Sequence, residues 1–258
     1  MSPRFVKTPA VVLKTGNYSE TSLLVTAFAR DLGKVRLIAK GARRRKSPFA
    51  GLIEPLAPLE LVLVPGRSGL HTLTECAPLG PVGRLRDELG RLSAGLFVLA
   101  LVDQTQADED PQPAVFDLMT QVLEQLETAR NVPALLFAFQ LRLIELSGYG
   151  LDLERCSGDE ASHDQAPLKG TGFYSPRHKG FLCKPCRSGL SGRAVSAGGF
   201  NVLKRLDGTP FEHVGRMRLS KAQTAELARL FDCVLETLLE KKLTVTSIIR
   251  KLGTPPAG

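Results

Sequence analysis

The chain has 258 residues, 43% of them apolar, and a net charge of +8. A chain of this size can bury real hydrophobic cores and by its length holds about two domains. Its most apolar stretch, residues 94–102, is too short to cross a bilayer, so we expect no membrane span. The N-terminus lacks the apolar core of a secretory signal, so we expect a cytoplasmic protein whose five cysteines stay reduced.

The charge is unevenly distributed along the chain. Residues 1–80 contain twelve Lys and Arg against five Asp and Glu, a balance of +7. Residues 81–150 have a balance of −5, and residues 151–258 a balance of +6. An acidic middle between basic ends indicates polyanion contact by the outer regions, with packing or protein docking by the centre.

Residues 8–78 form five short apolar runs separated by Gly, Pro, Asn and Ser, which predicts a small all-β unit. A five-stranded barrel of this length matches the oligonucleotide-binding (OB) fold, which carries nucleic acid on a strand face and the adjoining loops. An SH3-like barrel of similar size fits the pattern too. The predicted strands are residues 10–14, 22–29, 34–40, 59–64 and 70–76.

The stretch from Lys34 to Lys46 contains seven basic residues and no acidic one. A period of two places Val35, Leu37 and Ala39 in the core and turns most of the cations outward. Such a concentration of like charge favours a polyanion partner, nucleic acid above all. The alternatives are a merely solvated loop and contacts with acidic neighbours inside the same protein. The candidate DNA-binding residues are Lys34, Arg36, Lys40, Arg43, Arg44, Arg45, Lys46 and, in a neighbouring loop, Arg67.

Helical periodicity begins after Pro81, and we expect the apolar stripes of these helices to form core. Pro133 suits a first helical turn, Gly148 a C-cap and Ser220 an N-cap. Residues 151–199, rich in Gly, Pro and polar side chains, are then an insertion in one helical domain. The predicted stripes cover residues 85–102, 115–126, 135–146, 200–206 and 222–239. The predicted domains are 1–80, 81–150, 151–195 and 196–258.

Three cysteines have the spacing of a zinc knuckle: two are separated by two residues, and the third lies 27 positions earlier. The fourth position holds a carboxylate, which can bind zinc, and a nearby histidine can replace it. In the alternative interpretation the site has lost its metal, and Phe173, Tyr174 and Phe181 hold the hairpin by packing. The candidate ligands are Cys156, Asp159, Cys183 and Cys186, with His163 or His178 as substitutes.

Motifs of nucleotide-binding loops, nucleophile elbows and zinc peptidases are absent from the sequence, so we expect a protein that is not an enzyme. Two other functions fit the charge pattern and the cysteines. One is an RNA-binding or ribosome-associated barrel protein, and the other is a zinc-dependent hydrolase of nucleic acid. Few aromatic platforms are present, because the chain has no Trp and three Tyr, so binding should be mostly electrostatic.

Four segments, residues 10–14, 18–25, 32–47 and 71–75, closely resemble the bacterial recombination mediator family RecO. The resemblance implies an α+β multidomain protein with an N-terminal OB-fold barrel, an α-helical domain and a zinc-finger-like insertion. It also implies binding of single- and double-stranded DNA, annealing of strands coated with single-strand-binding protein (SSB), and loading of RecA together with RecR.

The resemblance further implies a nucleoid-associated protein whose acidic helical middle docks the C-terminal tail of SSB. One departure concerns the metal site. The family's usual zinc motif has two Cys-x-x-Cys pairs, whereas the first pair here ends in Asp159. This difference bears on metal binding and leaves the barrel untouched.

Overall fold

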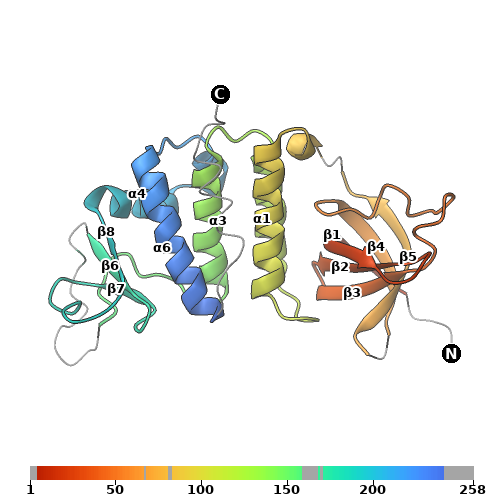
Figure 1. The fold of residues 1–258 in the computed structure, drawn as a ribbon, viewed down its shortest axis with the longest axis horizontal. Coiled ribbons are helices and arrows are strands. Elements are labelled where there is room, and N and C mark those ends of the chain that lie inside the picture. The colour runs from red at the N-terminus through yellow and green to blue at the C-terminus, as the bar shows by residue number, and fades with distance from the viewer. Residues whose placement is uncertain (1–4, 67, 81–82, 159–167, 169–170, 241–258) are drawn as a thin grey trace. The chain divides into compact units, whose positions relative to one another are not determined.

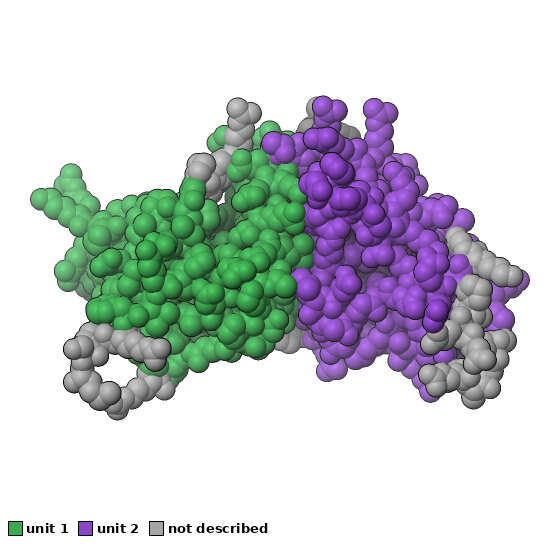
Figure 2. All heavy atoms as spheres, turned by 180° about the vertical axis from the view of Figure 1, so that it is seen from behind, with its two compact units in different colours: residues 1–127 green, residues 128–258 purple. Residues whose placement is uncertain are grey.

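The computed structural model describes residues 5–66, 68–80, 83–158, 168 and 171–240 (Figure 1). The predicted contact Arg67 and the candidate ligands Asp159 and His163 lie outside the described residues. The chain divides into two compact units, residues 1–127 and 128–258, which Figure 2 colours separately. No described helix combines the length and the apolar character that a membrane crossing needs.

The first unit begins with a closed five-stranded barrel, as predicted (Figure 1). The strand order is β1-β2-β3-β5-β4, and β1 pairs with β4 to close the sheet. All neighbouring pairs are antiparallel except β3 and β5, which run parallel. This is the OB-fold topology. The strands are β1 (Val6–Asn17), β2 (Leu23–Ala29), β3 (Gly33–Ala39), β4 (Pro58–Val64) and β5 (Leu70–Pro78).

The barrel interior is filled by the alternate apolar residues of its strands. In β3, Val35, Leu37 and Ala39 are at most 1% exposed, which confirms the predicted alternation. Phe49, from the long connection between β3 and β4, is 6% exposed and belongs to the same core. Burial of this aromatic side chain anchors a connection that otherwise consists of turns, so the loop has a fixed base.

Two helices complete the first unit after a short 3₁₀ turn, η1 (Gly83–Arg86): α1 (Leu89–Thr105) and α2 (Pro113–Leu126). An ion pair joins α2 to the barrel. The guanidinium of Arg30, which directly follows β2, donates two hydrogen bonds to the carboxylate of Asp117 in α2, each 3.0 Å long. The chain divides into its two compact units after Glu127, whereas the first predicted domain ends at residue 80.

The predicted stripe of α1 is wrong in part. Leu89 is 80% exposed and Leu96 is 40% exposed, although both were expected in the core. The reason is that α1 is apolar around most of its circumference, so the three- and four-residue steps do not define one face. The residues that α1 buries are Ala94, Gly95, Phe97, Val98, Leu99, Leu101 and Val102.

The second unit is built around α3 (Val132–Leu146), which packs against α4 (Ala197–Gly208), α5 (Phe211–Val214) and α6 (Lys221–Leu239). Three sequence predictions about helix ends are confirmed. Pro133 lies in the first turn of α3, and Gly148 follows its end with φ +82°. Ser220 caps α6 in a reciprocal capping box with Gln223.

Residues 151–199 contain a small sheet that the sequence did not predict in detail. Its order is β7-β6-β8, formed by β6 (Gly172–Ser175), β7 (Gly180–Leu182) and β8 (Arg193–Val195). Tyr174, Phe181 and Phe200 are fully buried and meet edge to face, with ring centroids 5.9 and 5.2 Å apart. The insertion therefore has its own aromatic core, shared with α4.

Candidate nucleic-acid interface

The cationic loop, Arg43, Arg44, Arg45 and Lys46, directly follows β3 and is exposed at all four positions. It rests on the turn between β1 and β2. The backbone N–H of Arg43 donates to the Thr21 carbonyl at 3.0 Å, and its guanidinium Nη1 donates to the Ser19 carbonyl at 3.1 Å. Because these acceptors are neutral carbonyls, the loop is positioned without losing any of its charge.

No acidic side chain neutralises this loop within the part of the chain that the structure describes. None of the ion pairs between described residues involves the cationic loop or Lys40. Lys40 itself is exposed at the end of β3. Five adjacent cations are therefore open to solvent, which is the arrangement that attracts a phosphate backbone.

Tyr18 lies in the turn that supports the cationic loop and was missed in the sequence analysis. Its side chain is 54% exposed, and its backbone N–H donates to the Ser22 carbonyl at 3.0 Å in the turn that supports Arg43. An exposed ring next to clustered cations is the combination on which nucleic-acid bases stack. The sequence signal was weak, since a single Tyr in a polar turn has no periodic partner.

Lys34 and Arg36 behave differently from the other predicted contacts. The ammonium of Lys34 donates to the Asp103 carbonyl at 2.7 Å and lies 3.4 Å from the Asp108 carboxylate, and its side chain is 14% exposed. Arg36 lies 3.3 Å from the other Asp108 oxygen and keeps 55% of its side chain exposed. Both cations of β3 are thus already paired inside the protein.

The acidic segment, Asp103, Asp108 and Glu109, supplies these pairs from the end of α1 and the connection to α2. It also reaches β1 and β5: Lys14 lies 2.6 Å from Asp103, and His71 Nε2 lies 2.9 Å from Glu109. A backbone bridge between Lys34 and Asp108 fixes the segment against β3. A phosphate could reach the Lys34 ammonium only by displacing these carboxylates.

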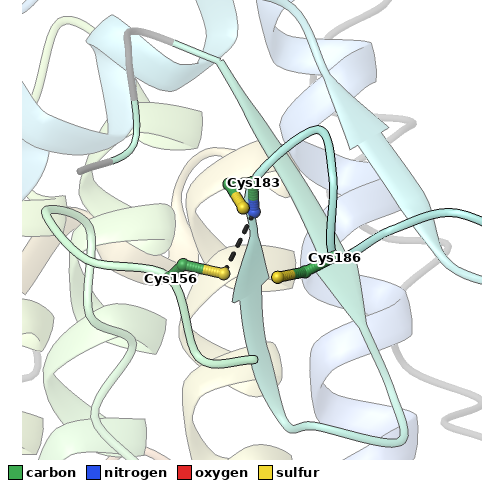
Figure 3. Close-up of side chains that lie close together, drawn as sticks. All are labelled: Cys156, Cys183 and Cys186. Carbon is green, nitrogen blue, oxygen red and sulfur yellow. Dashed lines mark hydrogen bonds between the residues drawn. The ribbon is translucent and has the colours of Figure 1, made fainter. Parts of the chain in front are cut away.

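The three cysteines of the predicted knuckle come together in the second unit (Figure 3). The sulfurs of Cys156, Cys183 and Cys186 all lie within 4.8 Å of one another. Cys156 Sγ accepts the backbone N–H of Cys183 at 3.2 Å and that of Gly158 at 3.4 Å. A Cβ on Gly158 would meet the sulfurs of Cys186 and Cys156 at 3.0 and 3.3 Å, so a side chain there would have to push the cysteines apart by a few tenths of an ångström.

The cysteine cluster has the donor chemistry of a thiolate metal site. Burial acts to raise the pKa of the Cys183 thiol, but hydrogen bonds from Cys186 and Cys156 lower it overall. Burial and the hydrogen bond with Cys183 raise the pKa of Cys186 to about 12. The cluster could hold a metal ion through three sulfurs, whereas the substitute ligand His178 instead contacts Ser175 Oγ through Nδ1 at 3.0 Å.

Comparison with known proteins finds two family profiles that together match most of the chain. The sequence profile "Recombination protein O N terminal" matches residues 1–82, and the profile "Recombination protein O C terminal" matches residues 86–246. The chain belongs to the RecO family. The predicted membership is thereby confirmed.

Several RecO relatives cover most of the chain. The DNA repair protein RecO of Roseiflexus sp. (strain RS-1) is 32% identical over 93% of this chain and 83% of its own length. That of Moorella thermoacetica is 30% identical over 97% of this chain and 92% of its own. That of Salinibacter ruber is 37% identical over 63% and 64% of the two chains.

Proposed function

We propose that this chain acts in DNA repair by binding single- and double-stranded DNA and annealing complementary strands. The observation that carries the proposal is the cationic loop at the open end of β3, unpaired among the described residues and fixed by backbone carbonyls. Membership of the RecO family supports the repair setting. By the same resemblance, the protein acts on SSB-coated DNA and with RecR helps to load RecA.

Annealing follows physically from this kind of surface. Exposed cations cancel part of the repulsion between two phosphate backbones and release their counterions. Binding through phosphates leaves the base edges free to pair. One exposed ring, Tyr18, provides some stacking at the loop without covering a whole strand. The interface we propose consists of Lys40, the cationic loop and Tyr18, with Arg36 at its edge and Lys34 engaged only when the acidic segment moves.

The direct test is annealing of complementary oligonucleotides that are each coated with SSB. We expect the purified chain to accelerate duplex formation, and absence of any acceleration would overturn the proposal. Affinity for single-stranded RNA of the same sequence, measured in parallel, distinguishes an RNA-binding protein. Progressive degradation of labelled DNA with added zinc, magnesium or manganese would instead indicate a hydrolase.

Replacing Asp108 by Asn should strengthen binding of single-stranded DNA. The substitution removes the carboxylate that pairs with Lys34 and Arg36, and the exposed pair with Arg36 alone accounts for up to about 1 kcal/mol, or roughly fivefold in affinity. The measurement is fluorescence anisotropy of a labelled oligonucleotide. Asp110→Asn is the matched control, because Asp110 contacts Gln112 at 3.1 Å instead. Equal gains in both variants would contradict a specific role of Asp108.

Replacing Tyr18 by Ala should weaken binding of single strands more than of duplex, because only unpaired bases offer their faces for stacking. Loss of one stacked base costs about 1–3 kcal/mol, which is roughly 5- to 150-fold in affinity. Tyr18→Phe keeps the ring and should bind nearly as well as the unaltered protein. If Tyr18→Ala weakens duplex and single strand equally, the ring does not stack on bases.

Metal analysis tests the cysteine cluster. We expect protein purified without chelator to contain close to one zinc per chain, because the three converging sulfurs supply three of the four ligands that a structural zinc site takes. Cys156→Ser should lose the metal, whereas Cys76→Ser should retain it, since Cys76 lies in the barrel strand β5. Elemental analysis decides, and a content far below one equivalent in unaltered protein would favour a structure held by aromatic packing alone.

A further inference from the structure

A second basic region lies in the second unit, and the proposed interface does not use it. Residues 165–206 contain eight Lys and Arg and no Asp or Glu. Forty-two consecutive residues without an acid are unusual in a chain that is 23% charged overall. Such a stretch cannot neutralise itself locally, so its charge must be balanced by other parts of the protein, by small ions or by a polyanion.

The structure shows that most of these cations are presented by the small sheet. Five of them lie in β8, in the turn between β6 and β7, and in the cysteine knuckle after β7, and all five are exposed. Within the described ranges, no ion pair involves any of them. We call these residues the basic sheet: Arg177, Lys179, Lys184, Arg187 and Arg193.

The spacing of the basic sheet suits an extended polyanion. Lys179 and Lys184 flank β7, and a strand rise of about 3.3 Å per residue puts their Cα atoms up to roughly 17 Å apart. A B-form strand has one phosphate per ~3.4 Å of axis, so about four or five phosphates fit this span. The buried aromatic core of Tyr174, Phe181 and Phe200 holds β6 and β7 rigid beneath the charges.

An exposed aromatic ring accompanies these cations. Tyr149, just after α3, is 44% exposed, and the ammonium of Lys179 lies 5.2 Å from the centroid of its ring. A ring held by a cation in this way can receive a base on its remaining surface while the cation contacts the adjacent phosphate. Stacking platforms of this kind favour nucleic acid over an acidic peptide, which has no flat bases to stack.

We propose that the basic sheet, together with Tyr149, binds the phosphate backbone of a second nucleic-acid strand. The proposal rests on the DNA-binding function proposed above and adds a site to it. Each unit of the chain then carries its own strand-binding surface. Two such surfaces on one molecule raise the effective concentration of one strand near the other, which is what annealing requires.

The test uses the full chain with Lys179, Lys184 and Arg187 all changed to Glu. Single-strand binding through the cationic loop should persist, whereas the slope of log affinity against log salt should flatten by about 2, or about 0.7 for each lost contact. The annealing rate should fall at least about tenfold. Tyr149→Ala should weaken single-strand binding roughly fivefold or more, and Tyr149→Phe should restore it.

The matched control changes Arg216, Arg218 and Lys221 to Glu. These three residues are exposed in the same unit but lie outside the acid-free stretch. Because three cations are replaced in each variant, both variants change the net charge equally. The proposal would be overturned if the control variant showed an equal flattening of the salt slope and an equal fall in annealing rate, because net charge alone would then explain both effects. Melting curves confirm folding, and if the Glu variant unfolds, the Gln variant of the same three residues should still flatten the slope.

The outcomes separate this proposal from the function on which it rests. If the unaltered chain neither binds nor anneals DNA, the proposed function fails. If the chain anneals and the basic-sheet variant anneals equally well, only the second strand site fails. Unchanged DNA binding combined with lost binding of a glutamate-rich peptide would show that the basic sheet receives an acidic protein segment, and would overturn the proposal as well.

Discussion

Changing the cationic loop, Arg43, Arg44, Arg45 and Lys46, to Glu should weaken single-stranded DNA binding by roughly 100-fold or more at moderate salt. Four phosphate contacts are lost, so the slope of log affinity against log salt should flatten by about 2.8. The fold should survive, because all four side chains are exposed and none packs in the barrel core. Annealing of SSB-coated strands should collapse in parallel.

A control with the same change of charge makes this result specific. Replacing Arg216, Arg218, Lys221 and Arg229 by Glu removes four exposed cations from the second unit. We expect this variant to lose only the small affinity that follows from net charge. An unaltered salt slope in the cationic-loop variant would mean that the loop is merely solvated, and the DNA-binding proposal would then lose its main support.

Replacing Gly33 by Val should destabilise the first unit by about 3 kcal/mol or more. Gly33 has φ +71°, a conformation that costs a side-chain-bearing residue about 1–2 kcal/mol. A Cβ there would also lie 2.1 Å from the backbone oxygen of Asp110, so either the turn at Gly33 or the backbone at Asp110 must move. Displaced contacts of this kind add about 1–3 kcal/mol. Denaturant unfolding of the full chain measures the loss.

Two other glycines separate the two contributions to this loss. Gly41 has the same φ of +71°, but a Cβ there would meet nothing nearer than Arg44 Cδ at 3.6 Å, so Gly41→Val should show the conformational cost alone. Gly16 lies in β1 with nothing within 4 Å of the added atom, and Gly16→Val should be nearly neutral. Equal losses for Gly33 and Gly41 would contradict the close approach of Asp110.

The barrel was predictable because its information is local. Strand alternation, the Gly and Asn turns and the basic run after β3 lie within short windows, and burial of Val35, Leu37 and Ala39 follows from a period of two. The zinc-knuckle cysteines were predictable for the same reason, since Cys183 and Cys186 define their own spacing. The convergence of Cys156 on them, 27 residues away, also agrees with the prediction.

The partners of Lys34 and Arg36 could not be predicted. Asp103 and Asp108 lie about seventy residues later, and only the folded chain brings them onto β3. The faces of α1 were unpredictable because its composition is apolar all round. Of the small sheet, only the hairpin around Phe173 and Phe181 was anticipated, because a strand as short as β8 shows no period.

The acidic segment also affects how DNA affinity would depend on salt concentration. The ammonium of Lys34 already faces the carboxylates of Asp103 and Asp108. A phosphate that took their place would displace these side chains and would release few counterions into solution. Counterion release would come almost wholly from the unpaired cations beyond Ala39. A titration with salt would therefore undercount the strand-face contacts, and calorimetry would be needed to detect them.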